Sequence, residues 1–206
     1  MNNLLESVKD KVGSFLIDKG YTKRGKNDFI RKEKLHKREE VISFSSRKGR
    51  APHTGQTYIG ITSGIYYKEV NSLDKKIIQD FLNSYPIITG SISHFKDTDN
   101  NFISIPINNS DQVESIANEI IENIKDGGFN LFNKFPTLES ILDGIEKKHE
   151  WLNDYHKFIK IRRQVRIAAM SLLIKDKDTA IHWFKENSLA SEKSKQEIIK
   201  KMETNW

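Results

Sequence analysis

The sequence predicts an α+β protein: an antiparallel sheet of about five strands with an N-terminal helix and a crossover helix, followed by an all-helical C-terminal region. Two observations lead to this class. In the first half of the chain, several segments carry apolar residues at every second position, which is typical of half-buried strands. From residue 110 onward, apolar residues recur at every third or fourth position, which is typical of helices. Glycines and a proline within 127–136 mark the change, so we expect an α+β domain over 1–128 and a helical subdomain over 129–206.

An amphipathic helix opens the chain. Apolar residues from Leu4 to Leu16 recur at three- and four-residue spacing, and Gly20 follows as the residue that ends the helix. Strands follow where β-branched and aromatic residues are enriched, and the first two pair as a hairpin across the charged connection 33–39. The expected strands span 28–32, 40–46, 56–67, 88–95 and 102–107. The crossover helix lies over 72–85, and Pro86 ends it.

The second half of the chain predicts only helices. Asp111 and Glu114 are spaced as a capping box at the start of the first helix, and Gly127 and Gly128 end it. A second start at Pro136 leads into a long helical region that extends to residue 159. Two or three shorter helices complete the chain.

Composition excludes several classes of protein. With 206 residues, of which 36% are hydrophobic, the chain is long enough to bury a core. The absence of cysteine excludes disulfides, thiolate metal sites and cysteine nucleophiles. Glu6 and Asp10 interrupt the N-terminus where a signal peptide needs an apolar run, and no segment approaches the roughly 20 apolar residues of a membrane span. We therefore expect a soluble cytoplasmic protein that does not associate with membranes.

The net charge of +6 is concentrated at one end of the chain. Residues 1–50 hold 14 Lys and Arg against 7 Asp and Glu, whereas the remainder holds 20 against 21. A basic patch of this kind attracts phosphate backbones or an acidic protein partner. The first quarter of the chain is therefore the expected place for a binding surface.

One end of the first hairpin is the candidate binding site. Because antiparallel strands place the end of one beside the start of the other, the loop after the second strand returns toward the turn before the first. Aromatic side chains there offer surfaces on which nucleic-acid bases stack. The predicted partner-binding or polyanion-binding residues are Lys23, Arg24, Lys26, Arg47, Lys48, Arg50, His53 and Tyr58. The alternative interpretation is that the cations blunt an edge strand against aggregation.

Catalytic patterns are weak throughout the chain. His149 and His156 share one helical face, but a metal site favours closer spacing with a supporting ligand. His94, near Asp97 and Asp99, is better explained by a polar turn. Neither a phosphate-binding glycine loop nor a nucleophile elbow occurs. We therefore expect no catalytic residues, no metal and no cofactor, with an enzyme built on unrecognised polar residues as a third hypothesis.

A basic amphipathic segment, KFIKIRRQVRIAAM, lies near the C-terminus. Its arginines are candidates for a recognition helix that contacts phosphates. The alternative is that the helix packs against the sheet while its arginines are solvated or form ion pairs within the same helical region. The acids available for such pairs are Glu146, Glu150 and Asp154.

The first half of the chain resembles the bacterial domain-of-unknown-function family 4304. The resemblance spans roughly residues 4–125 and rests on an amphipathic helix, the strand sequences VISFSSR (41–47) and TYIGITSGI (57–65), and a glycine-aromatic, basic pattern. That pattern consists of Gly20, Tyr21, Lys23, Arg24, Gly25, Phe29 and Arg31. The resemblance implies a small α+β domain. It also implies a place in bacterial conflict loci, where members resemble candidate immunity proteins beside toxins.

Two functions therefore follow from the sequence. The first is a non-catalytic protein-binding module, an immunity or antitoxin-like protein of a bacterial conflict system. Its partner is a protein with an acidic surface, such as a toxin, because a basic protein associates fastest with an opposite charge. The alternative is a nucleic-acid-binding factor that uses the basic end of the hairpin, with an affinity that falls steeply with salt.

Overall fold

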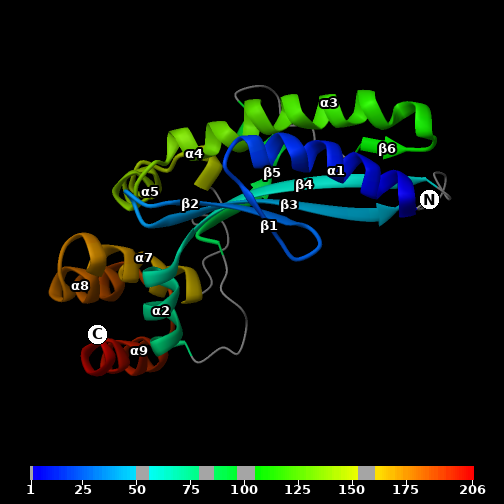
Figure 1. Ribbon diagram of the computed structural model, residues 1–206. Coiled ribbons are helices and arrows are strands. Elements are labelled where there is room, and N and C mark those ends of the chain that lie inside the picture. The colour runs from blue at the N-terminus through cyan, green and yellow to red at the C-terminus, as the bar shows by residue number, and fades with distance from the viewer. Residues whose placement is uncertain (1, 50–55, 79–85, 97–104, 153–160) are drawn as a thin grey trace. The chain divides into compact units, whose positions relative to one another are not determined.

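The computed structural model describes residues 2–49, 56–78, 86–96, 105–152 and 161–206 (Figure 1). Within them the chain forms an N-terminal helix, a six-stranded antiparallel sheet and a set of C-terminal helices, which confirms the predicted α+β class. The chain divides into two compact units. The first comprises 1–66 with 88–134, and the second comprises 67–87 with 135–206. None of the helices within the described ranges is long and apolar enough to cross a bilayer.

Helix α1 (Asn2–Asp18) covers one face of the sheet in the first unit (Figure 1). Val8, Val12 and Leu16 recur every four residues and are fully buried, so they form the apolar stripe that the sequence predicts. The helix ends at Asp18, and Gly20 follows in the closing turn with a φ of +84°. The amide of Tyr21 donates to the carbonyl of Leu16, and this contact turns the chain toward the sheet.

The strands follow one another in sheet order from β1 to β5. Strand β6 also pairs with β4, at residues 57–59, whereas β5 pairs with β4 at residues 62–65. Their bounds are β1 (Thr22–Arg24), β2 (Asp28–Glu33), β3 (Arg38–Lys48), β4 (Thr57–Tyr67), β5 (Ile88–Ser91) and β6 (Ile105–Ile107). The predicted hairpin is β2 with β3, in a register that places Phe29 opposite Ile42 and Ile30 opposite Val41. All four of these side chains are buried. Strand β1, a short exposed edge strand, was not expected from the sequence.

Two of the predicted elements have different bounds. The strand expected over 88–95 ends at Ser91, and Ile92–Phe95 is a 3-10 helix, η1. The crossover helix α2 (Lys68–Ile77) begins directly after β4, four residues before the predicted start, and 79–85 lie outside the described residues. Its buried stripe includes Asn71 and Asp74 alongside Val70 and Ile77. Because Asn71 and Asp74 are polar, the first turn of this helix lacks the apolar spacing that predicts a helix from sequence.

The helical run after β6 is longer than predicted. It consists of η2 (Ser110–Gln112), α3 (Val113–Asn123), the π-helical turn η3 (Ile124–Phe129) and α4 (Asn130–Lys134), and α3 packs beside α1. Its capping box is made by Asn109 and Gln112, so the prediction of Asp111 with Glu114 was wrong. Gly127 and Gly128 do not end the helix. Gly127 instead lies against the backbone of η1, where a Cβ atom would overlap the carbonyl oxygen of Ile92.

The second unit is helical and contains α2. The other helices are α5 (Leu138–Glu146), the 3-10 turn η4 (Glu150–Leu152), α7 (Ile161–Ile174), α8 (Lys177–Asn187) and α9 (Glu192–Asn205). Thr137 and Ser140 form a capping box, which confirms the helix start predicted after Pro136. One buried hydrophobic cluster of this unit consists of Ile77, Val165, Ala168, Phe184, Ile198 and Met202. The units thus differ from the predicted division at 128, because α2 belongs with the C-terminal helices and 129–134 continue the first unit.

We predict that Gly127→Ala destabilises the protein by about 1–3 kcal/mol, because the new methyl group forces the η1 backbone and the π-helical turn apart. Gly128→Ala is the matched control, since its Cβ would meet the flexible end of Ile42 at 3.1 Å. Urea denaturation measures both variants. Equal stability of Gly127→Ala and Gly128→Ala would contradict the proposed role of this close approach.

Candidate functional site

The predicted binding residues lie on three strands and one turn of the first unit. Lys23 and Arg24 belong to β1, Lys26 to the following turn, Arg47 and Lys48 to the end of β3, and Tyr58 to β4. The amide of Phe44 donates to the carbonyl of Asn27 at 2.9 Å, so the turn after β1 lies beside the middle of β3. Some of the residues singled out in the sequence fall outside the described residues. They are Arg50, His53, Asp97, Asp99, Asp154 and His156.

Arg47 and Tyr58 are brought together on neighbouring strands. The Arg47 guanidinium carbon lies 5.6 Å from the centre of the Tyr58 ring, within the range of a cation–π contact. The Tyr58 hydroxyl donates to Oε1 of Gln56 at 2.6 Å, which orients the ring. These two predicted residues, Arg47 exposed and Tyr58 half-buried, therefore form one basic and aromatic surface at the end of β3.

Arg24 is directed away from that surface. Its guanidinium lies 4.0 Å from the carboxylate of Glu39, which is also 3.9 Å from the Lys32 ammonium. Glu39 and Arg47 are eight residues apart in β3, or about 26 Å along the strand. Arg24 and Arg47 therefore do not lie together on one binding surface.

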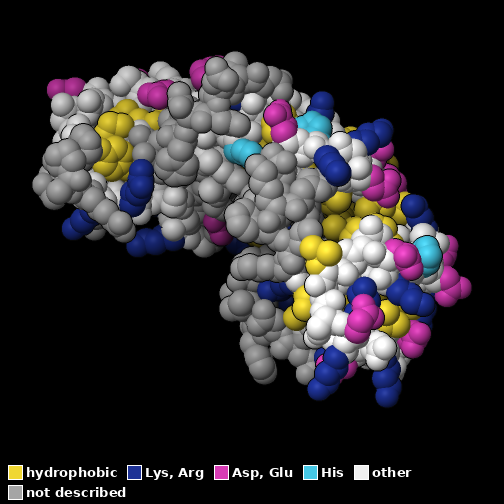
Figure 2. Space-filling view, turned by 180° about the vertical axis from the view of Figure 1, so that it is seen from behind, with side chains coloured by type: hydrophobic (Ala, Val, Ile, Leu, Met, Phe, Trp, Pro, Cys, Tyr) yellow, Lys and Arg dark blue, Asp and Glu magenta, His cyan; other side chains and the backbone are white. Residues whose placement is uncertain are grey.

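Basic side chains on the face shown in Figure 2 occur at several separate places, among acidic and hydrophobic side chains. Many of the cations of β1–β3 have acidic neighbours within the hairpin. Arg24 and Lys32 lie near Glu39, while Arg31 and Arg38 contact Glu40. The positive charge that the sequence places in the first quarter is thus partly neutralised where β2 and β3 pair.

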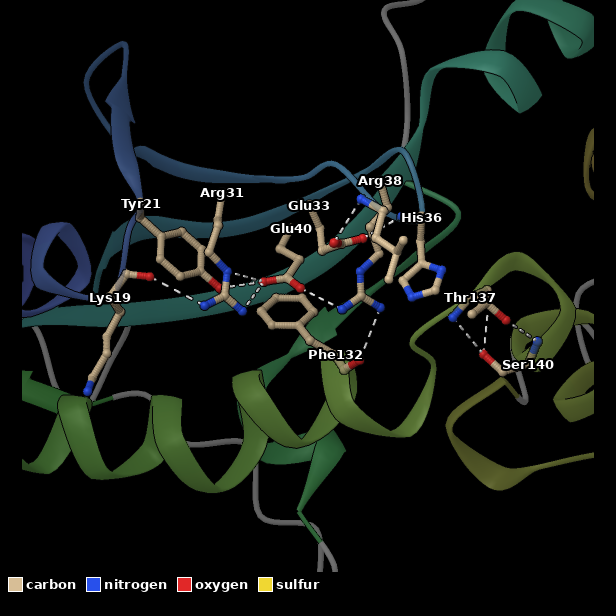
Figure 3. A network of polar contacts seen from close by, with 11 residues as sticks. Lys19, Tyr21, Arg31, Glu33, His36, Arg38, Glu40, Phe132, Thr137 and Ser140 are labelled. Atoms are coloured by element: carbon tan, nitrogen blue, oxygen red, sulfur yellow. Dashed lines mark hydrogen bonds and ion pairs between the residues drawn. The ribbon is translucent and has the colours of Figure 1, made fainter.

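Glu40 is the centre of a buried polar network (Figure 3). Its side chain is fully buried. One carboxylate oxygen accepts from Nε of Arg31 at 2.8 Å and from the Tyr21 hydroxyl at 3.0 Å, and the other lies 2.6 Å from a terminal nitrogen of Arg38. Arg38 also donates to the carbonyl of Phe132 in α4 at 3.1 Å. The network therefore connects β2, β3 and the segment before β1 with the helical layer.

Tyr21 and Arg31 close the network on its outer side. Arg31 lies over the Tyr21 ring, 5.0 Å from its centre, and donates to the carbonyl of Lys19. Tyr21 stacks on Phe129 of η3 at 6.2 Å. Burial raises the pKa of the Tyr21 hydroxyl, and the negative charge of Glu40 raises this pKa further. Tyr21 is thus a neutral hydrogen-bond donor to Glu40.

The turn Lys34–Lys37 joins β2 to β3, and we call it the hairpin tip. The Glu33 carboxylate accepts from the amides of Leu35 at 3.0 Å and His36 at 2.7 Å. These backbone hydrogen bonds, above all that from His36, lower the pKa of Glu33 below its ordinary value. Leu35 itself is 81% exposed. The tip therefore presents an apolar side chain on a backbone that its own hydrogen bonds hold in place.

The C-terminal arginines have structural partners in the second unit. Arg166 is buried and lies 3.0 Å from the carboxylate of Asp74, and Arg162 lies 3.4 Å from the same carboxylate. Arg166 also donates to the carbonyl of Pro86 at 3.1 Å. Asp74 was not among the predicted partners. Because these two arginines are engaged with α2, they hold helices together and do not form a surface for phosphates.

Two of the described histidines, His94 and His149, pack against aromatic rings. His149 packs edge-on against Phe135 and Trp151, each with ring centres 5.3 Å away. His94 contacts Phe95 in the same manner at 5.2 Å. In the part of the chain that the structure describes, no three His, Cys, Asp or Glu side chains are grouped as metal ligands.

Sequence reasoning missed the Glu40 network and the hairpin tip. The signal for the network is present, because Arg31 and Glu33 in β2 lie directly opposite Glu40 and Arg38 in β3. Charged residues at every second position on paired strands indicate cross-strand ion pairs. From the sequence alone, we interpret the cations as a binding surface or as protection of an edge strand, and Glu40 falls in the expected strand 40–46 without an assigned partner.

No family model, curated protein or solved structure matches this chain. Membership of family 4304 therefore stays a proposal.

We predict that Glu40→Gln destabilises the protein by about 3–5 kcal/mol, because it removes the charge that compensates the buried Arg38. Glu39→Gln is the control and is expected to cost less than about 1 kcal/mol, since its ion pairs are exposed. Thermal and urea unfolding measure both. A Glu40→Gln variant as stable as Glu39→Gln would show that the network contributes little.

We also predict that the amides of Leu35 and His36 titrate with a midpoint below 4.5, the ordinary pKa of the Glu33 carboxyl. The folded pKa is lowered, so the two hydrogen bonds are fully formed above the unfolded pKa and are lost as the pH falls through the folded value. Amide chemical shifts measured by NMR from pH 7 to pH 2 follow this loss. Glu33→Gln abolishes the titration, and a midpoint above 4.5 would contradict the assignment.

Proposed function

We propose that this protein is a non-catalytic protein-binding module, an immunity or antitoxin-like protein of a bacterial conflict system. The observation that carries the proposal is the pairing of the hairpin's cations with acids of the same hairpin. Arg31 and Arg38 are engaged with the buried Glu40, and Arg24 and Lys32 flank Glu39. A surface that binds a polyanion needs such cations available for phosphates, whereas here Arg31 and Arg38 stabilise the buried Glu40, and Arg24 and Lys32 have an acidic neighbour.

The partner that fits this scaffold is a protein with an acidic surface. The chain keeps a net charge of +6, so opposite charge on a partner accelerates association and disfavours basic competitors. The resemblance of residues 4–125 to family 4304 supports the same conclusion, because members of that family resemble immunity proteins beside toxins.

The second candidate is a nucleic-acid-binding factor. The contact between Arg47 and Tyr58 favours it, because an aromatic ring beside an arginine is a surface on which a base stacks. Lys48, also exposed at the end of β3, adds a further positive charge. This surface contains fewer residues than the sequence predicts, since Arg24 is directed toward Glu39.

We predict that Arg24→Glu with Arg47→Glu elutes from heparin at the same salt concentration as Lys185→Glu with Lys200→Glu. The second pair gives the same net charge and changes exposed lysines in α8 and α9. Equal elution indicates that net charge alone determines retention on heparin. Markedly earlier elution of the first variant would instead support the nucleic-acid function.

The direct test is affinity capture with the tagged full chain from native cell extract, with and without nuclease, followed by mass spectrometry. The proposed function predicts a protein partner that is retained after nuclease treatment. Recovery of nucleic acid, with no protein left after the treatment, would contradict it and support the second candidate.

A further inference from the structure

We infer that the hairpin tip, Lys34–Lys37, is the element that enters the partner protein, and that the partner receives it in an apolar pocket rimmed by carboxylates. This inference rests on the proposed protein-binding function and specifies its contact. Neither the composition nor the sequence motifs assign any role to this turn.

The first step is the exposure of Leu35. It is 81% exposed, more than the other large hydrophobic side chains that the structure describes as exposed, including Leu189 at 74%. Leu35 stands at the end of a hairpin whose paired residues Ile30 and Val41 are buried. It projects from a well-packed element and is therefore available as an anchor side chain.

The second step is the local order of the backbone. Both oxygens of the Glu33 carboxylate are used, one by the amide of Leu35 and the other by that of His36. The amide of Lys37 donates back to the carbonyl of Lys34 at 3.4 Å, which closes the turn. A turn that is ordered before binding loses little conformational freedom when a partner closes around it.

The third step is the residue at the strained position of the turn. Lys37 has a φ of +53°, in the left-handed region where hairpins of this kind usually carry glycine. Here the side chain supplies positive charge two residues after Leu35, and Lys34 supplies it on the preceding side.

The fourth step identifies the partner's chemistry. An aliphatic side chain between two exposed lysines fits an apolar pocket with acidic residues at its rim. A nucleic acid accepts an apolar side chain only as a wedge between unstacked bases, and a membrane surface requires a larger apolar face than one side chain. The combination favours a protein partner of the acidic kind.

The experiment replaces Leu35 with the photo-crosslinking residue benzoylphenylalanine in the full chain, which is then irradiated in native cell extract. The expected result is a cross-link to another protein, through a peptide of that protein that contains both apolar and acidic residues. The same probe at Leu189, the matched exposed leucine in the second unit, is expected to give no such cross-link. Equal labelling from both positions, a basic target peptide, or a cross-link to nucleic acid or to a second copy of this chain would overturn the inference.

Two variants test the anchor and the charges separately. Leu35→Asp is expected to weaken capture of the cross-linked protein by at least about 30-fold, as for a binding hot spot. Lys34→Glu with Lys37→Glu is expected to weaken it at least about 10-fold more than Lys185→Glu with Lys200→Glu. Circular dichroism confirms that each variant is folded.

The outcomes separate this inference from the function on which it rests. A partner that survives nuclease but binds Leu35→Asp as tightly as the native chain overturns the role of the tip and leaves the protein-binding function standing. If the native chain retains no protein partner at all, the proposed function itself is contradicted. The inference that the hairpin tip enters a partner is then contradicted as well.

Discussion

A buried carboxylate with two arginine partners is the interaction on which the first unit depends. Glu40 has no contact with solvent, and burial of a lone carboxylate costs several kcal/mol unless it is paired and hydrogen-bonded. Arg31, Arg38 and the Tyr21 hydroxyl meet this requirement from three directions. Because they belong to β2, β3 and the segment before β1, the register of these elements is set together. A shift by one residue would place the charges on opposite faces of the sheet.

The network also connects the hairpin with the helical layer and with its own tip. Arg38 bonds to the α4 backbone through the carbonyl of Phe132, and it lies directly after the tip residue Lys37. Glu33, opposite Arg38 in the register, orders the other side of the turn. The same cations that appear in the sequence as a basic patch thus fix a hairpin, and the feature they leave projecting is Leu35.

Much of the fold was predictable because local patterns agree with tertiary structure. The stripe of Val8, Val12 and Leu16 and the apolar β-branched residues of β4 indicate their elements directly. Buried polar residues interrupt such patterns. Asn71 and Asp74 lie on the buried face of α2, so the sequence predicts the start of this helix at the wrong residue. Gly127 was assigned to a helix end because its real neighbour, the backbone of Ile92, is distant in sequence. The site was harder for the same reason, since a charge such as that of Arg31 is read as solvated until its buried partner is known.

The most direct test of this account is the backbone order of residues 34–37 in the free protein, measured by ¹⁵N relaxation. A hairpin tip held by Glu33 and supported by the Glu40 network is expected to show order parameters of about 0.85, as in rigid secondary structure. Order parameters below about 0.6 would contradict the account, because a turn that samples many conformations cannot serve as a preformed anchor.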